Sequence, residues 1–339
     1  MSDGWAILNA SIIEASHLVA TAAPDEATVA EGEAYVTRVV TAALSTAFMG
    51  HRLVQSGLAM ALPVYGGPNP DYLMRHAAID PAGRYRVEGQ LNGSERVGVG
   101  LYSIGPNGAP LIAGYTAFDR TNCAPDGSFA LDLSADASGP GSLAIPPAAR
   151  ILMFRVLHRD GSPPAYLALA GAPPLRGPTL VAGSNDSALA FAANNVRANI
   201  AEYMKWVRAA RDLPNRLAAA PAELAETVIG DADTQYFLGG FDLGERQYVE
   251  VVMPAGLTGY WSLHAYNYWY EHLVTPGVHD RNAAPEADGT VRIVVGPDIP
   301  ADRMNRIDTL GRRKGAFICR VAGHGQPIQA PSVVTRFLT

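Results

Sequence analysis

Cysteine and charged residues are scarce in this sequence of 339 residues. Its two cysteines, Cys123 and Cys319, are too few for a disulfide framework, and we expect both to be reduced structural thiols. Charged residues make up 17% of the chain and the net charge is -6, so the basic excess of a nucleic-acid-binding surface is missing. These shortages exclude a disulfide-stapled scaffold and predict no nucleic-acid partner.

Long apolar runs are missing as well. The sequence has no stretch of about 18 consecutive apolar residues, so it predicts no membrane-spanning helix. No basic segment stands ahead of the first apolar residues, and polar residues interrupt them. We therefore expect no secretory signal, no membrane partner and a cytoplasmic location.

The standard catalytic signatures are also absent. The sequence contains no Gly-x-Ser-x-Gly elbow, P-loop, His-Glu-x-x-His, Cys-x-x-Cys or Gly-x-Gly-x-x-Gly motif. Several large enzyme classes are thereby removed, and we expect no cofactor.

What the sequence does have is a globular composition rich in turn formers. Hydrophobic residues make up 48%, with 34 glycines and 25 prolines between short apolar runs. This pattern is typical of a core-forming protein with a large β content. Tyr85 and Val87, for example, alternate with the polar residues around them, as expected for a half-buried strand.

Helical periodicity separates the β-rich parts. Residues 5–60 read as helix, with Val36, Val39 and Ala43 on one stripe and Gly50 at the expected C-cap. We expect such helices to cover a sheet. The predicted segments are listed here in order: helical 1–65, a first β segment 66–182, helical 183–232, and a C-terminal β segment 233–339. The predicted fold class is α+β, mainly antiparallel, with a jelly-roll-like β-sandwich. Two β segments, each preceded by helices, are compatible with a distant duplication.

The most unusual stretch is 260–280, YWSLHAYNYWYEHLVTPGVHD, which is rich in Tyr, Trp and His. It alternates with period two. A strand through this stretch would place His264 and His272 on one face, and Asn267, Trp269 and Glu271 on the other. Each face mixes apolar bulk with polar tips, which favours the wall of a pocket over a plain core.

The C-terminal third resembles the bacterial family called domain of unknown function 1214, which is often found beside domain of unknown function 1254. The likeness lies in YWSLHAYNYWYEHL, in DGTVRIVVG (288–296) and in RMNRIDTLGRRKGAFICRV (303–321). An upstream motif, NPDYLMRHAAIDPAGRYRVEG (69–89), resembles the N-terminal half of longer members, with Tyr72 where an Asn is expected. The resemblance implies a jelly-roll β-sandwich with helical decoration and no settled activity.

Acid–base chemistry is the function that we assign to the aromatic stretch. Glu271 follows Tyr and Trp residues whose bulk would desolvate its carboxyl group and raise its pKa, as a general acid requires. We assign Glu271, Asp308 and His76 as catalytic, with Asp71 as another source of the second titrating group. The structural alternative is that Glu271 and Asp308 stabilise turns and that the aromatics are core.

The substrate pocket is predicted to be lined by 260–272, 305–308 and 71–76. The expected substrate-binding residues are Asn267, Tyr268, Trp269, Tyr72, Arg75, Asn305 and His264. A metal site at the histidines is the less favoured alternative, because His264 and Glu271 would lie on opposite strand faces, and we expect no metal.

The sequence therefore predicts an enzyme for a small organic or carbohydrate-like molecule, acting by hydrolysis or elimination. The alternative is a non-catalytic binding or scaffold protein that uses the same aromatic pocket. The expected partners are a small-molecule substrate or ligand and, in the scaffold alternative, a second copy of the chain.

Overall fold

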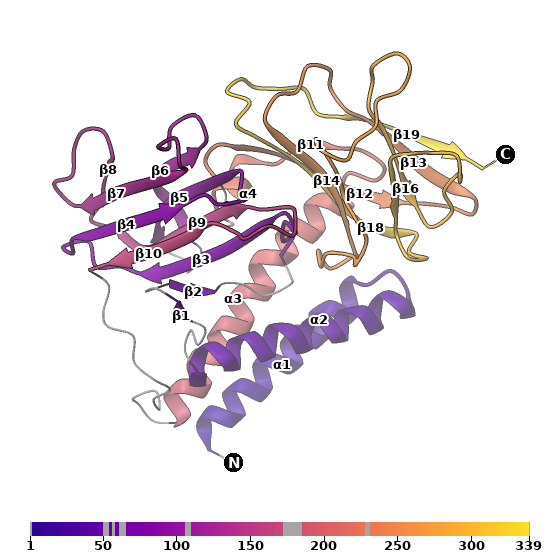
Figure 1. The fold of residues 1–339 in the computed structure, drawn as a ribbon. Helices are drawn as coiled ribbons and strands as arrows, with labels where there is room; N and C mark the ends of the chain where they lie inside the picture. The colour runs from indigo at the N-terminus through magenta and orange to yellow at the C-terminus, as the bar shows by residue number, and fades with distance from the viewer. Residues whose placement is uncertain are drawn as a thin grey trace.

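Two β-sandwiches stand side by side over a layer of three helices (Figure 1). The structure is a computed structural model. The residues that it describes are 2–49, 54–55, 58–60, 66–105, 110–171, 185–227 and 231–338. The fold is α+β and its sheets are mostly antiparallel, as the sequence predicts.

The helices begin the chain and return between the two sandwiches. They are α1 (Asp3–Ala22), α2 (Glu26–Leu44), the π-helical η1 (Ser45–Met49), α3 (Asn185–Arg211) and α4 (Ala222–Thr227). The Asp25 carboxylate caps α2 by accepting a bond from the Thr28 amide at 2.8 Å. The predicted helix through residue 60 is wrong at 54–55 and 58–60, which form two short strands; Gly50 lies outside the described residues.

The N-terminal sandwich contains the first ten strands. They are β1 (Val54–Gln55), β2 (Leu58–Met60), β3 (Tyr72–Ala78), β4 (Tyr85–Gln90), β5 (Arg96–Ile104), β6 (Pro110–Asp119), β7 (Ser128–Ser134), β8 (Ser142–Ala144), β9 (Ala149–Leu157) and β10 (Tyr166–Ala170). One sheet has the order β1-β2-β3-β9-β5-β6 and the other has the order β10-β4-β7-β8.

The C-terminal sandwich contains the remaining nine strands. They are β11 (Ala218–Ala219), β12 (Thr234–Asp242), β13 (Gln247–Val252), β14 (Tyr260–Tyr266), β15 (Val278–His279), β16 (Arg292–Gly296), β17 (Arg306–Asp308), β18 (Lys314–Ala322) and β19 (Ser332–Phe337). Its sheets have the orders β11-β12-β18-β14-β15 and β17-β16-β13-β19.

The two sandwiches have the same strand order. Replacing β2–β10 by β11–β19 in sequence converts β2-β3-β9-β5-β6 into β11-β12-β18-β14-β15, and β10-β4-β7-β8 into β19-β13-β16-β17. Each sandwich also contains one parallel strand pair, and the two pairs are equivalent. They are β7–β8 and β16–β17, the parallel pairs among the described strands. Each sandwich has a core of its own between its sheets. The chain is therefore a structural repeat, although its sequence shows no strong internal repeat.

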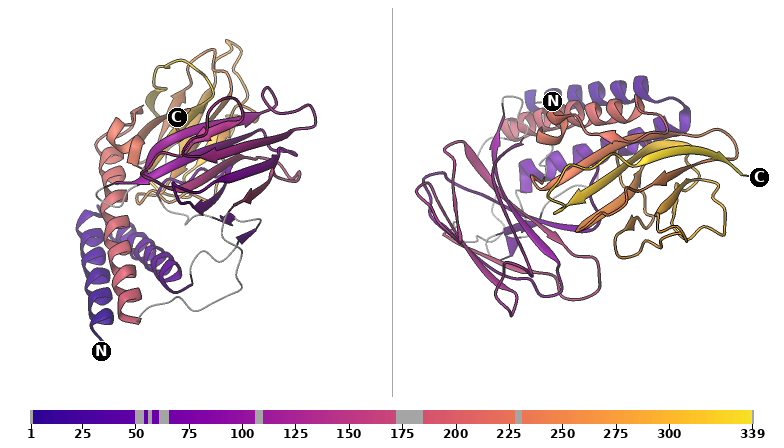
Figure 2. Two further views of the ribbon diagram at one scale, coloured as in Figure 1. Left: turned by 90° about the vertical axis from the view of Figure 1, so that its left-hand side faces the viewer. Right: turned by 90° about the horizontal axis from the view of Figure 1, so that it is seen from above.

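The helical layer covers the outer face of one sheet of the C-terminal sandwich. Stripes of α1, α2 and α3 pack with Leu238, Tyr266, Ala316 and Ile318 of that sheet, which confirms that the helices cover a sheet. In the view from above, the helices run along one side of the sandwiches (Figure 2). No described helix has the length and apolarity needed to span a membrane.

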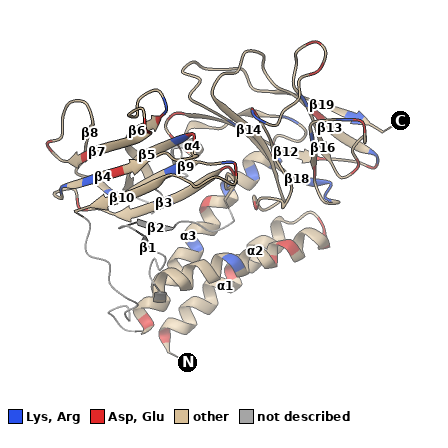
Figure 3. Ribbon diagram, viewed as in Figure 1, with Lys and Arg blue, Asp and Glu red and all other residues tan. Residues whose placement is uncertain are grey.

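Residues of both charge signs are dispersed over the two sandwiches (Figure 3). Cys123 and Cys319 are both free thiols, which confirms that they do not pair. Cys319 is buried in the core of the C-terminal sandwich, where burial raises the pKa of its thiol to about 12.

Candidate functional site

Equivalent surfaces of the two sandwiches meet at a shared junction. The strand registers align β3, β5 and β9 with β12, β14 and β18, because Leu157 pairs with Tyr72 and Arg96 just as Ala322 pairs with Thr234 and Tyr260. Tyr72, Leu157, Tyr260 and Ala322 form a small apolar cluster there. The junction is polar on both sides of this cluster.

On one side, Tyr260 joins the two sandwiches through its hydroxyl group. The hydroxyl lies 2.7 Å from Asp71 Oδ2 and 2.6 Å from Ser262 Oγ, and accepts a bond from Asn69 Nδ2 at 2.8 Å. Tyr72 packs edge-on against the Tyr260 ring, with centroids 5.5 Å apart. Of the 71–76 segment, Asp71 and Tyr72 therefore contact the aromatic strand.

His264 and His272 lie beside this hydrogen-bonded group. Nε2 of His264 is 3.7 Å from Asp71 Oδ1, and its ring is 5.5 Å from that of His272. Nδ1 of His264 and Nε2 of His272 are buried without a hydrogen-bond partner. Two unpartnered imidazole nitrogens in one interior are unusual, because buried polar atoms are nearly always paired.

The charges of this group are set by its burial and by its neighbours. Burial alone would raise the pKa of Asp71, but His264 and the Tyr260 hydroxyl favour the carboxylate and lower it to about 2. Burial lowers the pKa of His264 despite the opposing effect of Asp71, and lowers that of His272 to about 4. Burial also raises the pKa of Tyr260 well above its ordinary value. At neutral pH the group is an ionised Asp71 beside two neutral imidazoles and a protonated phenol.

Arg320 lies at the inner end of this group of buried polar side chains. Its guanidinium donates to the Tyr266 hydroxyl at 2.8 Å and to the Gly67 carbonyl at 2.5 Å. Its central carbon also lies 5.8 Å from the centre of the Tyr266 ring and 6.0 Å from that of Tyr236. Arg320 is therefore fully engaged in positioning the aromatic walls.

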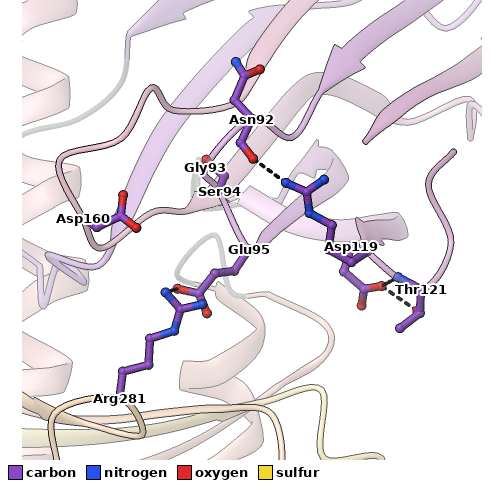
Figure 4. A pocket seen from close by; sticks show the side chains of 9 residues that line it. Asn92, Gly93, Ser94, Glu95, Asp119, Thr121, Asp160 and Arg281 are labelled. Carbon is purple, nitrogen blue, oxygen red and sulfur yellow. Dashed lines mark hydrogen bonds and ion pairs between the residues drawn. The ribbon is translucent and has the colours of Figure 1, made fainter. Parts of the chain in front are cut away.

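A surface cavity of about 470 Å³ opens at the outer end of the junction (Figure 4). It is lined by Asn92, Gly93, Ser94, Glu95, Asp119, Arg120, Thr121, Asp160 and Arg281. Glu95 accepts bonds from the buried Arg159 at 2.6 and 2.8 Å, and Arg159 also binds Asp280 and lies 5.1 Å above the centre of the Tyr260 ring. Arg159 thus connects the polar cavity to the buried group.

The aromatic stretch is not one strand. β14 ends at Tyr266, and 267–271 form a turn in which Tyr270 has a φ of 61°. The prediction of a strand through His272 is therefore wrong. Asn267 Oδ1 accepts bonds from the amides of Trp269 and Glu271, both at 3.0 Å, and so replaces the ladder bonds that a strand would make.

The turn anchors the helical layer. Arg38 of α2 binds the two Glu271 oxygens at 2.5 and 2.6 Å, and Asn267 Nδ2 donates to the same carboxylate at 2.9 Å. The Trp269 indole donates to the Thr28 carbonyl and stacks on Tyr35, while the Tyr268 hydroxyl donates to the Ala22 carbonyl. These contacts use the polar atoms of Glu271, Asn267, Tyr268 and Trp269. The four residues therefore anchor the turn to the helical layer.

Asn305 and Asp308 lie on the other sheet of the C-terminal sandwich. Asn305 Nδ2 donates to the Ala284 and Arg292 carbonyls, and its Oδ1 accepts from the Ala284 amide. On β17, Ile307 points into the core, whereas Asp308 points outward and accepts a bond from the Leu310 amide. The structure does not bring Asn305 or Asp308 to the junction, because the sandwich core lies between them and β14.

His76 and Arg75 are neighbours on β3 and point to opposite faces of their sheet. His76 pairs with Met153 of β9 in the backbone register. Arg75 donates to the Met74 carbonyl and lines a smaller cavity of about 230 Å³ with Leu73, Val156 and Leu167. Of the predicted site residues, the structure therefore gathers His264 and Tyr72 at the junction with Asp71.

The residues that sequence reasoning missed are Arg159 and Arg320, and Tyr260 and Ser262 lie within the predicted lining 260–272 but were assigned no role of their own. Ser262 and His264 stand two positions apart on β14, so the period of a strand predicts a shared face. The long-range partners gave no such signal, because Tyr260 and Asp71 are 189 residues apart. Among the described residues, no three His, Cys, Asp or Glu side chains are arranged to hold a metal ion.

Similarity to one solved structure supports the fold. The chain is similar over 98% of its length to 96% of an uncharacterized protein from Burkholderia cenocepacia, with a TM-score of 0.83 and 24% identity. The VPA0106 protein from Vibrio parahaemolyticus aligns over 90% of this chain and 97% of its own, with a TM-score of 0.48 and 12% identity. No family model and no curated protein matches the chain.

Proposed function

We propose that this protein is an enzyme that acts on a small organic or carbohydrate-like molecule by acid–base chemistry, through hydrolysis or elimination. The single observation that carries the proposal is His264, a buried imidazole with Nε2 facing the Asp71 carboxylate and Nδ1 unpartnered. A histidine oriented by a carboxylate is the arrangement of a general base.

The protonation states support these roles. Because Asp71 stays ionised and His264 stays neutral at neutral pH, the imidazole is free to accept a proton from a substrate or from water. The imidazolium that forms would be stabilised by the adjacent carboxylate. Tyr260 keeps its proton and can donate a hydrogen bond to developing negative charge.

The cavity at the outer end of the junction is the proposed entry for the substrate. Its acidic and basic side chains offer hydrogen bonds to hydroxyl and carbonyl groups. Arg159 stands between this cavity and Tyr260, so a substrate that reaches His264 must displace or share its bonds to Glu95 and Asp280.

The second candidate function is ligand binding without turnover. The position of Arg159 favours it, because four hydrogen bonds to Glu95 and Asp280 close the buried group off from the cavity. A ligand would then bind in the cavity alone, against Glu95 and Arg281, and leave unaltered.

The test compares two variants with one control. Turnover is measured on a panel of glycosides, esters and hydroxylated cyclic compounds for the wild type, Asp71→Asn and His264→Gln. We expect each of these variants to lose at least about 100-fold in kcat, the usual contribution of a positioned base. Asp233→Asn is the control, because Asp233 holds the equivalent position in the other sandwich and does not contact His264.

Unchanged turnover in folded His264→Gln would reject the catalytic role of the histidine. Binding of a panel compound that is recovered unaltered, and that survives His264→Gln but is lost in Glu95→Gln, would favour the binding function instead.

We also propose that the chain belongs with the family of domain of unknown function 1214, on the motifs in 260–273, 288–296 and 303–321. Successive strands cross between the two sheets of each sandwich, which supports a jelly-roll variant. The free cysteines fit a cytoplasmic location. An experimental structure and the location of the tagged protein in cells test these assignments.

A further inference from the structure

The repeat places two arginines at equivalent positions. Arg155 of β9 pairs with Met74 and Gly98, and Arg320 of β18 pairs with Tyr236 and Ser262, in the matching registers of the two sandwiches. Both side chains point away from their own sandwich core, and both are at least nine-tenths buried, at 9% and 5% exposure.

Their environments differ. Arg320 donates to Tyr266 and Gly67, as described above. Nε of Arg155 is buried and has no hydrogen-bond partner. Within the described ranges, no carboxylate lies within 4.0 Å of the Arg155 guanidinium either. A buried cation without a partner is costly, so its surroundings must supply a compensating group.

The neighbours of Arg155 offer it no direct ion pair. The carboxylate that acts on it through space, Asp231, is bound by Arg96 at 3.0 Å, and Arg96 also binds Asp233 at 2.7 Å. Both carboxylates therefore make their close contacts with Arg96, and the Arg155 guanidinium has no such contact in the described part of the chain.

A second unpartnered donor lies on the same face. Tyr72 of β3 is two positions from Met74, the cross-strand partner of Arg155, and its hydroxyl group is buried without a partner. Diagonal neighbours of this kind are about 7–8 Å apart at the backbone, within the reach of long side chains. The second neighbour of Arg155, Gly98, has no side chain, and the Tyr115 hydroxyl lies over it.

We propose that Arg155 and Tyr72 form a binding site for a small oxyanion, such as a carboxylate or inorganic phosphate, at the junction of the two sandwiches. Both unpartnered groups are donors, since a guanidinium Nε carries a hydrogen and so does a phenol. A carboxylate or phosphate supplies acceptor oxygens for both donors and the direct ion pair that Arg155 lacks among the described residues. The site shares Tyr72 with the junction but does not include Asp71 or His264, so it does not require the proposed catalysis.

The test is a thermal titration of the intact protein with sodium acetate and with sodium phosphate. Sodium chloride of equal ionic strength provides the baseline. A bound anion raises Tm with concentration, because a ligand that binds only the folded state stabilises it. We expect such a rise in the wild type and its loss in Arg155→Met. Acetate and phosphate compared at equal concentration identify which oxyanion the site prefers.

Arg150→Met is the matched control, because Arg150 lies on the same strand and is exposed. It removes the same charge and should keep the full rise, which separates the site from general salt effects. Tyr72→Phe should weaken anion binding several-fold without abolishing it. Isothermal calorimetry of the same variants measures this difference in Kd.

An equal rise in wild type and Arg155→Met, or no rise above chloride in the wild type, would overturn the proposal. If Arg155→Met does not fold, Arg155→Lys keeps the charge but loses the guanidinium Nε donor, and it must then bind the anion more weakly than wild type. His264→Gln should bind the anion normally, so that failure of the catalytic proposal does not affect this one.

Discussion

The two sandwiches share a strand order and differ in what the junction does with it. At the equivalent positions of β5 and β14, the N-terminal sandwich has Gly98 and Gly100, whereas the C-terminal sandwich has Ser262 and His264. The glycines leave space that the Tyr115 and Tyr102 hydroxyls fill. At these positions the C-terminal sandwich therefore carries Ser262 and a buried His264, whereas in the N-terminal sandwich Arg155 of the neighbouring strand β9 has no direct ion pair among the described residues.

The contacts across the junction are related in the same way. Arg96 binds Asp231 and Asp233, and Tyr260, which is equivalent to Arg96, binds Asn69 and Asp71. The Asx turns match as well, since the Asp71 and Asp233 amides both lie 3.1 Å from a side-chain oxygen two residues earlier. The two sandwiches therefore share this backbone geometry and differ in the charges that it carries.

The largest expected difference is in the unfolding free energy of variants at the two equivalent arginines. Arg320→Met removes the buried donor to the Gly67 carbonyl and to the Tyr266 hydroxyl, which keeps only its own bond to the Pro68 carbonyl, and we expect a loss of about 3–5 kcal/mol in unfolding free energy. Arg155→Met removes a charge that has no direct ion pair among the described residues, so in chloride buffer it should cost less than about 1 kcal/mol or stabilise. Urea denaturation of both variants measures the difference. Equal losses would show that Arg155 is as fully paired as Arg320.

The next effect compares the two equivalent aspartates. Asp71 has its pKa lowered to about 2, so its contribution is present above pH 4 and is lost as pH falls from about 4 to about 2. Asp71→Asn should cost about 2 kcal/mol at pH 7, at about 1.4 kcal/mol per pKa unit. Asp233 is half exposed, so Asp233→Asn should cost less than about 1 kcal/mol. Unfolding measured from pH 7 to pH 2 should show a smaller acid-dependent loss in Asp71→Asn than in the wild type, by about the same 2 kcal/mol.

The histidines should make the C-terminal sandwich more sensitive to mild acid. The pKa of His272 is lowered to about 4, so between about pH 6.5 and 4 the unfolded chain binds a proton that the folded chain does not. Stability should fall over that window by about 1 kcal/mol, because the ring is partly exposed and therefore screened. Hydrogen exchange at pH 7 and pH 5 should show protection lost first around β14. A uniform loss over both sandwiches, or no change in His272→Gln, would contradict this assignment.

The smallest effects should be equal in the two halves. Asp126 and Asp288 each accept the amide and hydroxyl of the Ser or Thr two residues later, at 2.6–2.9 Å. Because the two turns lead into equivalent strands and are both exposed, Asp126→Ala and Asp288→Ala should each lower Tm by at most about 2 °C. Differential scanning calorimetry checks the match. A clear difference would limit the equivalence of the sandwiches to their strand order.

Strands with regular alternation were predictable. RYRVEG and ILMFRVL each carry the pattern of burial in their own residues, and the structure has strands at both. The end of β14 was not predictable. The alternation of the sequence continues to His272, whereas the Asn267 side chain stabilises a turn through the Trp269 and Glu271 amides. That turn is stabilised by Arg38, Tyr35 and Thr28, which belong to a helix more than two hundred residues earlier.

The candidate site was predicted in part, for a related reason. His264 and Tyr72 could be identified as polar or aromatic residues in unusual stretches. Glu271 has the same appearance in sequence, and only its contact with Arg38 distinguishes an anchoring carboxylate from the one at the junction, Asp71.

Local sequence patterns predict the α+β composition, the strands with clear alternation and the helical stripes. These properties depend on residues that are neighbours along the chain. Only the tertiary structure showed that the two β segments share one strand order and that their equivalent faces meet. It also showed which of two equivalent arginines is paired. Arg155 and Arg320 each stand in a short Arg-Val run on an equivalent strand, and the groups that compensate one and not the other come from distant segments. Long-range packing, which no local pattern encodes, therefore determines how each of these equivalent side chains is paired.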